Sequence, residues 1–80
     1  MNLKPIKANM TEVSFGKYRI LFSYETPVAY EIVSGDQSGV YRTDKFWSRT
    51  TTRHINQWLN GRFANNIEQK YLDNIALEVK

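Results

Sequence analysis

The sequence of 80 residues contains no cysteine, one histidine and two prolines, and it has no long apolar run. Without cysteine the chain cannot form disulfides or thiolate metal sites, and a single histidine excludes a histidine-rich metal site. No segment approaches the roughly 18–20 apolar residues that a membrane-spanning helix needs. The basic start of the chain lacks the apolar run of a signal peptide. We therefore expect a cytoplasmic protein that uses no cofactor and does not contact a membrane.

The length and the aromatic content predict one small folded domain. Eighty residues correspond to a single domain. The chain carries two tryptophans, five tyrosines and four phenylalanines, and each large ring can bury ~150–250 Å². Residues 1–9 are polar, contain Pro5 and show no periodicity. We expect them to form a loosely ordered lead-in.

Alternation of apolar and polar residues dominates the first half of the chain and predicts strands. The alternating segments are residues 10–15, 18–24, 28–33 and 40–43. Turn residues separate them, at Gly16–Lys17, at Glu25–Thr26–Pro27 and, as the clearest loop, at Ser34–Gly39. Because these connections are too short for parallel crossovers, we predict a three- to four-stranded antiparallel meander.

Helical spacing replaces this alternation after residue 46. Ile55, Trp58 and Leu59 are spaced i, i+3 and i+4, which predicts one buried stripe of a helix near residues 50–60. We expect Ser48 or Thr50 to cap its N-terminus, with Phe46 or Trp47 packing back as a hydrophobic staple. Gly61 predicts its end.

A second helix is predicted over residues 66–77, opened by a capping box of Asn66 and Gln69. Helices of about ten residues are marginal alone in water, so both must dock on the sheet. The predicted fold class is α+β, with two short C-terminal helices packed on one face of the meander. The residues to which we assign structural roles are Pro27, Trp47, Ile55, Trp58, Leu59 and Gly61.

The polar face of the first predicted helix is the candidate binding site. It lies opposite the apolar stripe and comprises Arg49, Arg53, Asn56, Gln57 and Asn60. Residues 42–62 also carry five basic side chains against one acidic residue, Asp44. Arginine and aromatic residues dominate protein interfaces, which favours a protein partner or a second copy of the chain. Arginine, asparagine and glutamine also read base edges in the major groove, so nucleic acid is the alternative partner.

Catalytic patterns are weak, and we expect a non-enzymatic protein. His54 would serve as a base for some serine, but no G-x-S-x-G motif accompanies it. The acidic residues are dispersed, and the glycines fit turns rather than a phosphate loop. A further alternative is a base-stacking platform on the sheet. It would use Tyr18, Tyr24, Tyr30 and Tyr41 with Lys17, Arg19 and Arg42.

Three segments resemble a family of short uncharacterised proteins met mainly in bacteriophages and prophages. The first reads F-S-Y-x-T-P-V-A and begins at Phe22; the second and third combine as W-S-x-T-T-T-x-H-I-x-x-W-L from Trp47 to Leu59. The resemblance covers about residues 15–62. It implies a viral or mobile-element origin and a host-cytoplasm setting, and it implies no particular biochemical activity.

Overall fold

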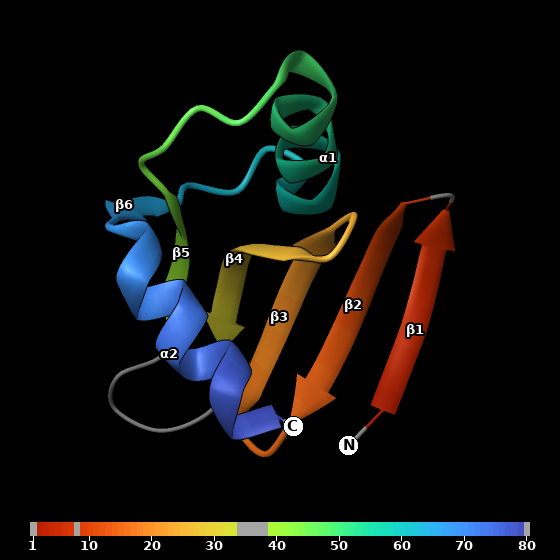
Figure 1. Cartoon of the computed structure of the whole chain (residues 1–80), viewed down its shortest axis with the longest axis vertical. Helices are drawn as coiled ribbons and strands as arrows, with labels where there is room; N and C mark the ends of the chain where they lie inside the picture. Colours follow the sequence, from red (N-terminus) through yellow and green to blue (C-terminus); the bar gives the residue numbers. More distant parts are fainter. Residues whose placement is uncertain (1, 8, 34–38, 80) are drawn as a thin grey trace.

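The computed structural model describes residues 2–7, 9–33 and 39–79, and it has an α+β fold (Figure 1). Its elements in chain order are β1 (Asn2–Lys7), β2 (Met10–Phe15), β3 (Tyr18–Ser23), β4 (Thr26–Ile32), β5 (Gly39–Thr43), α1 (Arg49–Leu59), β6 (Asn65–Ile67) and α2 (Gln69–Val79). The strands form one six-stranded sheet in sequential order. Neighbouring strands are antiparallel except β5 and β6, which are parallel.

The predicted antiparallel meander is confirmed over β2 to β5. The loop predicted after Val33 falls on residues 34–38, which lie outside the described residues, and Gly39 already belongs to β5. Gly16, with φ of 56°, opens the two-residue turn between Phe15 and Tyr18. A glycine at this position adopts the positive φ of a type II′ turn without strain.

Tyr24 occupies the equivalent position in the turn between β3 and β4, where Ser23 pairs with Thr26. Its φ is 58° although it is not a glycine, and such a conformation costs of order 1–3 kcal/mol. The Tyr24 backbone N–H donates to the Asn9 carbonyl at 2.7 Å, which holds the turn against the connection between β1 and β2. The chain therefore keeps an aromatic side chain at a place that favours glycine.

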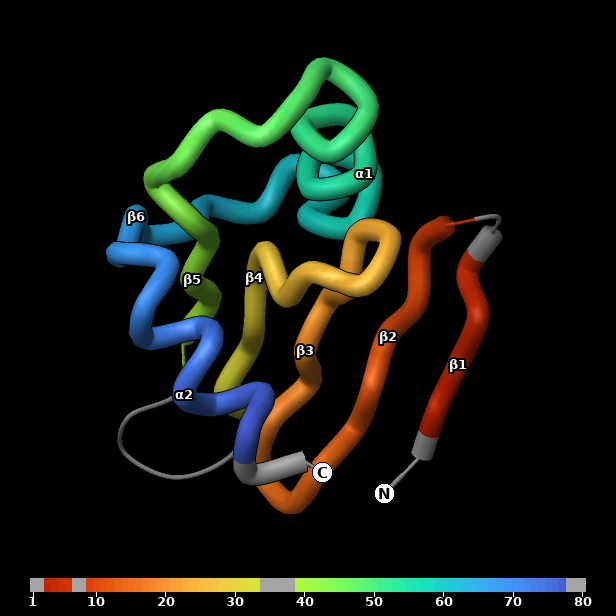
Figure 2. Tube along the Cα trace, viewed as in Figure 1, coloured from red at the N-terminus to blue at the C-terminus, as the bar shows by residue number. Residues whose placement is uncertain are grey.

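The sheet is larger than predicted, because a strand was missed at each edge (Figure 2). The prediction of a loosely ordered lead-in is wrong for residues 2–7, which pair with β2. The capping box predicted at Asn66 is also wrong, since Asn66 pairs with Arg42 in the sheet and α2 begins at Gln69. Both edge strands show weak alternation, because an edge position buries little of either face.

Helix α1 begins and ends close to the predicted residues. Ser48 is the N-cap, and its hydroxyl accepts a hydrogen bond from the Thr51 backbone N–H at 3.1 Å. At the other end Asn60 adopts the left-handed conformation, with φ of 50°, and its N–H donates to the Asn56 carbonyl. Gly61 follows with φ of 86°, so two successive residues of positive φ turn the chain away from the helix.

The two helices lie on opposite faces of the sheet, and the prediction that both pack on one face is wrong. Ile20 and Leu21 are adjacent in β3, so their side chains point to opposite faces, yet both are fully buried. Leu21 belongs to a core with Ile55, Trp58 and Leu59 of α1. Ile20 belongs to a second core, which Leu72 of α2 completes. The apolar pair at positions 20 and 21 requires cover on both sides of the sheet.

The connection before α1 does not form the predicted hydrophobic staple. Phe46 is 70% exposed, and Trp47 is 40% exposed. The Trp47 indole N–H donates to the Gln69 side chain of α2 at 3.2 Å. Gln69 in turn donates to the carbonyl of the buried Pro27 at 2.7 Å. Trp47 therefore links the entry of α1 to the start of α2 through Gln69.

Neither of the two helices found among the described residues has the length and apolarity that crossing a membrane would require.

Leu72→Ala tests whether the α2 face is a true core. Because Leu72 is fully buried in the second cluster, we expect the free energy of unfolding to fall by roughly 2–5 kcal/mol. Leu77→Ala on the exposed side of the same helix is the matched control and should change it by less than about 0.5 kcal/mol. Urea unfolding measures both values. Equal values for the two variants would contradict the assignment of this core.

Candidate functional site

The polar residues predicted as a binding face all lie on the outward side of α1. Arg49, Arg53, Asn56 and Gln57 are exposed, as is Asn60 immediately after the helix. The opposite side of the helix carries the buried Ile55, Trp58 and Leu59. The 3.6-residue period therefore separates the two sets as the sequence pattern predicts.

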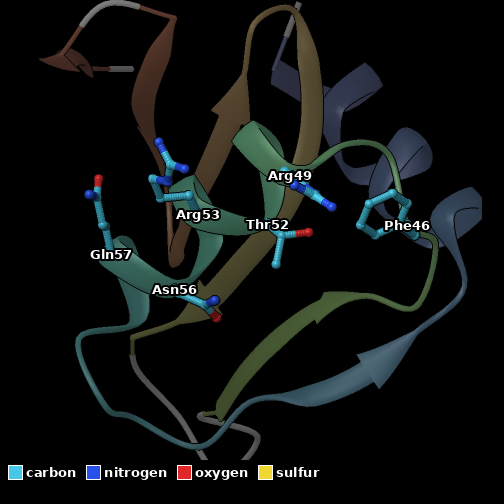
Figure 3. Close-up of a pocket in the computed structure, with 6 residues that line it drawn as sticks. All are labelled: Phe46, Arg49, Thr52, Arg53, Asn56 and Gln57. Carbon is cyan, nitrogen blue, oxygen red and sulfur yellow. The ribbon is translucent and has the colours of Figure 1, made fainter.

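Four of these residues line an open groove of about 450 Å³, together with Phe46 and Thr52 (Figure 3). In Figure 3 the Arg49 side chain extends from the first turn of α1 toward the Phe46 ring. Asn60 is not among the lining residues. Sequence reasoning missed Phe46 as part of this site, because an aromatic residue just before a helix reads as a staple. We call the surface formed by these six lining residues the α1 groove.

The surroundings of the α1 groove are basic. A second hollow of about 360 Å³ shares Phe46 and Thr52 with it and adds Arg42, Lys45 and Asp44 among its lining residues. None of the ion pairs found in the described part of the chain involves Arg49 or Arg53. Both side chains are exposed, and no described carboxylate pairs with either guanidinium group, which suits an anionic partner.

Arg62 does not belong to this basic surface. It donates to the Trp58 and Leu59 carbonyls at 3.2 and 3.0 Å, which satisfies two carbonyl groups at the C-terminal end of α1. Its third contact is an ion pair with Glu31 at 2.8 Å. The Arg62 side chain therefore joins the end of α1 to β4.

The buried side of α1 is joined to the sheet through the Glu12 carboxylate. Its Oε1 accepts hydrogen bonds from the Trp58 indole N–H at 2.9 Å and from Arg19 at 3.0 Å. Arg19 also pairs with Glu31 at 3.3 Å. Burial alone would raise the pKa of Glu12, but the hydrogen bonds from Trp58 and Arg19, with the positive charges of Arg19 and Lys4, lower the pKa below its ordinary value.

His54, which the sequence did not place, lies buried between α1 and the hairpin of β3 and β4. The Ser23 hydroxyl lies 2.8 Å from His54 Nδ1 and 3.0 Å from the Thr51 hydroxyl. The Tyr24 ring lies beside the imidazole, with centroids 6.1 Å apart. Ser23 is only 2% exposed, so its hydroxyl is not presented to a substrate as a nucleophile requires. These contacts hold the first turns of α1 against the hairpin.

The tyrosines do not form the predicted base-stacking platform. Tyr30 stacks on Tyr41 at 4.9 Å and meets Tyr18 edge to face at 6.0 Å, but Tyr30 is buried in the core beneath α2. Burial raises the pKa of Tyr30, with Tyr41 and Tyr18 adding to the shift. Tyr24 lies away from this row at the hairpin turn, and Arg19 points to the opposite face, where it binds Glu12. The row therefore serves the core.

Among the described residues, no group of three or more histidine, aspartate or glutamate side chains is arranged to hold a metal ion.

Glu12→Gln tests the buried carboxylate through the pH dependence of stability. The folded-state pKa of Glu12 lies below its ordinary value, so the contribution of Glu12 to stability is present above the ordinary pKa and is lost as pH falls through the folded pKa. We expect the variant to be less stable by roughly 1–3 kcal/mol at neutral pH. We also expect it to lose less stability than the wild type on acidification.

Urea unfolding between about pH 7 and pH 3 measures this difference. Glu68→Gln removes an exposed carboxylate and is the control, for which we expect the acid dependence of the wild type. An identical acid dependence in Glu12→Gln and the wild type would show that the buried carboxylate has no such role.

Ser23→Ala tests the buried hydrogen bonds around His54. Removing the hydroxyl takes a partner from both His54 and Thr51 inside the structure, and we expect a loss of about 1–3 kcal/mol in the free energy of unfolding. Ser14→Ala at a less buried position of β2 is the control. A change no larger than that of the control would mean that the cluster does not stabilise the docking of α1.

One of the comparisons with known proteins identifies a family. The comparisons with curated proteins and with solved structures gave no match. A family model, described as a family of unknown function (DUF8033), matches residues 1–74. This match spans every strand, α1 and the first half of α2. The chain therefore belongs to this family of unknown function, DUF8033.

Proposed function

We propose that the chain is a small non-enzymatic binding protein that engages a protein partner through the α1 groove. The observation that carries this proposal is the convergence of four predicted residues with an exposed phenylalanine in one groove. Arginine beside an aromatic ring is the composition of interface hot spots. The partner surface that fits this groove is acidic and presents an apolar side chain to Phe46.

The rigidity of α1 supports this role. Ser48 and Arg62 satisfy backbone groups at its two ends, and Trp58 and His54 fix its buried side to the sheet. A binding face that is already ordered loses little conformational entropy when a partner docks. In this proposal the protein partner is either another protein or a second copy of the chain.

Nucleic acid is the second candidate partner, and the charge distribution favours it. Arg42, Lys45, Arg49 and Arg53 lie in or beside the two hollows, against one acidic residue, Asp44. The exposed asparagine and glutamine of α1 add the side chains that contact adenine edges in the major groove. On this alternative α1 enters the major groove of the nucleic acid, while Lys45 and Arg42 contact phosphates.

The setting that we propose is that of a phage-type accessory protein in a host cytoplasm. The support for it is the resemblance of the stretch from Trp47 to Leu59 and of the strand before Pro27 to proteins met mainly in phages and prophages. Small accessory proteins in that setting act on host components by binding, which agrees with the α1 groove as the working surface.

Arg49→Ala/Arg53→Ala tests the α1 groove as a protein-binding surface. A tagged chain is used to capture proteins from lysate of the cells that naturally contain it, and captured proteins are quantified by mass spectrometry. We expect the double variant to lose roughly tenfold or more of the enrichment, because two hot-spot side chains are removed. Lys17→Ala/Lys70→Ala, which removes the same charge from other exposed positions, should retain it.

A sizing column on the same three proteins covers the case in which the partner is a second copy. A species larger than a monomer that disappears only in the Arg49→Ala/Arg53→Ala variant would assign the groove to self-association. Captured proteins that are retained equally by all three chains, without such a species, would refute the role of the groove.

The nucleic-acid alternative predicts binding that depends on salt. Anisotropy of a labelled mixed-sequence DNA duplex should show affinity falling roughly tenfold or more between about 50 and 200 mM salt, since phosphate contacts release counterions. The Arg49→Ala/Arg53→Ala variant should bind more weakly and with a smaller salt dependence. The absence of binding at the lower salt concentration would exclude this alternative.

A further inference from the structure

A second groove lies on the other face of the sheet, beside α2. It consists of two adjoining hollows of about 460 and 230 Å³ that share Phe22 and Glu25. The first extends to Leu3 of β1, and the second extends to Leu77 of α2. We call this continuous surface the α2-side groove. It is separate from the α1 groove, with which it shares no lining residue.

The groove exists because α2 covers only part of its face. Leu72 packs on Ile20 of β3 and on Tyr30 and Ile32 of β4. In Figure 2, α2 runs across β4 and β3 while β1 and β2 lie clear of it. Apolar side chains on the β1 side of Ile20 therefore have no helix above them.

Large apolar side chains at the rim of the groove are open to solvent. Leu3 is 68% exposed, Tyr24 is 52% exposed and Leu77 is 65% exposed. Exposed apolar residues that are scattered singly need no explanation, but a contiguous set around a hollow indicates an interaction site. Tyr24 also keeps its ring there at the expense of a strained backbone, with φ of 58°. Strain of this kind is retained at functional positions more often than elsewhere.

The charges around the α2-side groove are acidic. Its two charged lining residues are Glu25 and Asp73, and no lysine or arginine is among the residues that line either hollow. Glu25 takes part in none of the ion pairs found among the described residues. Asp73 accepts one hydrogen bond, from Gln69 at 3.1 Å. The groove thus combines an apolar floor with two carboxylates that can receive cationic side chains.

We propose that the α2-side groove is a docking site for a partner protein segment that carries apolar side chains flanked by lysine or arginine. The apolar side chains pack on Phe22, Leu3 and Leu77. The flanking cations pair with Glu25 and Asp73. The chain then has two recognition surfaces of opposite charge, and this second surface does not depend on the function proposed for α1.

A peptide-display selection against the whole chain tests this docking site. Random peptides of about twelve residues are selected, and the affinity of individual peptides is then measured by fluorescence anisotropy. We expect enriched peptides to combine apolar residues with lysine or arginine. We expect Glu25→Lys/Asp73→Lys to weaken their binding roughly ten- to hundredfold, because attraction is replaced by repulsion.

Matched variants separate a docking role from a loss of folding. Asp44→Lys/Glu68→Lys makes the same change of charge at exposed positions outside the groove and should leave the affinity unchanged. Tyr24→Gly relieves the positive φ, which offsets the loss of the ring contact with His54, so thermal stability should change little. Binding should nevertheless weaken by about fivefold or more through loss of the ring. Recovery of binding to Glu25→Lys/Asp73→Lys by a peptide with its lysines changed to glutamate would establish the charge pairing.

Three outcomes would overturn the proposal. Enriched peptides without cationic residues would remove the argument from charge. Peptides that bind the wild type and Glu25→Lys/Asp73→Lys equally would place their site elsewhere. A concentration-dependent dimer on a sizing column that Leu77→Ser alone abolishes would assign the groove to a second copy of the chain instead.

Discussion

The carboxylate of Glu12 brings a charge into the interface between the sheet and α1, and the arrangement of that interface depends on keeping the charge paired. Trp58 and Arg19 both donate to the same oxygen. Arg19 then continues to Glu31, and Glu31 to Arg62 at the end of α1. A buried carboxylate that lost these donors would be costly to keep ionised. The network therefore fixes the C-terminal end of α1 over the sheet, and this contributes to the orientation of the outward groove.

The parts of the fold that could be predicted are those in which local periodicity and tertiary environment agree. Apolar and polar residues alternate in β2 to β5, because successive side chains of a strand point to opposite faces of the sheet. α1 was predictable because Ser48 caps it and because Ile55, Trp58 and Leu59 lie on one stripe. The five residues of the candidate face followed from the same helical period. Their exposure required no knowledge of the sheet.

The parts that were missed depend on contacts distant in sequence. β1 and β6 exist because β2 and β5 offer unpaired edges, and their own residues carry little pattern. The opposite placement of the helices was overlooked although Ile20–Leu21 and Val28–Ala29 put apolar side chains on both faces of the central strands. His54 could not be placed because its environment includes Ser23 and Tyr24, about thirty residues earlier. Phe46 was missed as part of the α1 groove for a similar reason. Nothing in the local sequence shows that its ring is exposed rather than packed in a core.

Pro5 in the edge strand β1 determines how far the sheet can be extended. Phe15 and Tyr18 close a two-residue turn, so hydrogen-bonded pairs recur at every second residue of β2. The intervening residues of β2, Ser14 and Glu12, therefore direct their backbone groups toward β1, where they pair with Asn2 and Lys4. The backbone groups of Leu3 and Pro5 point outward, away from β2. Proline has no N–H to offer there, so the outer edge lacks a donor in the middle of the strand. An incoming strand would find an interrupted template at this edge, which disfavours extension of the sheet beyond β1.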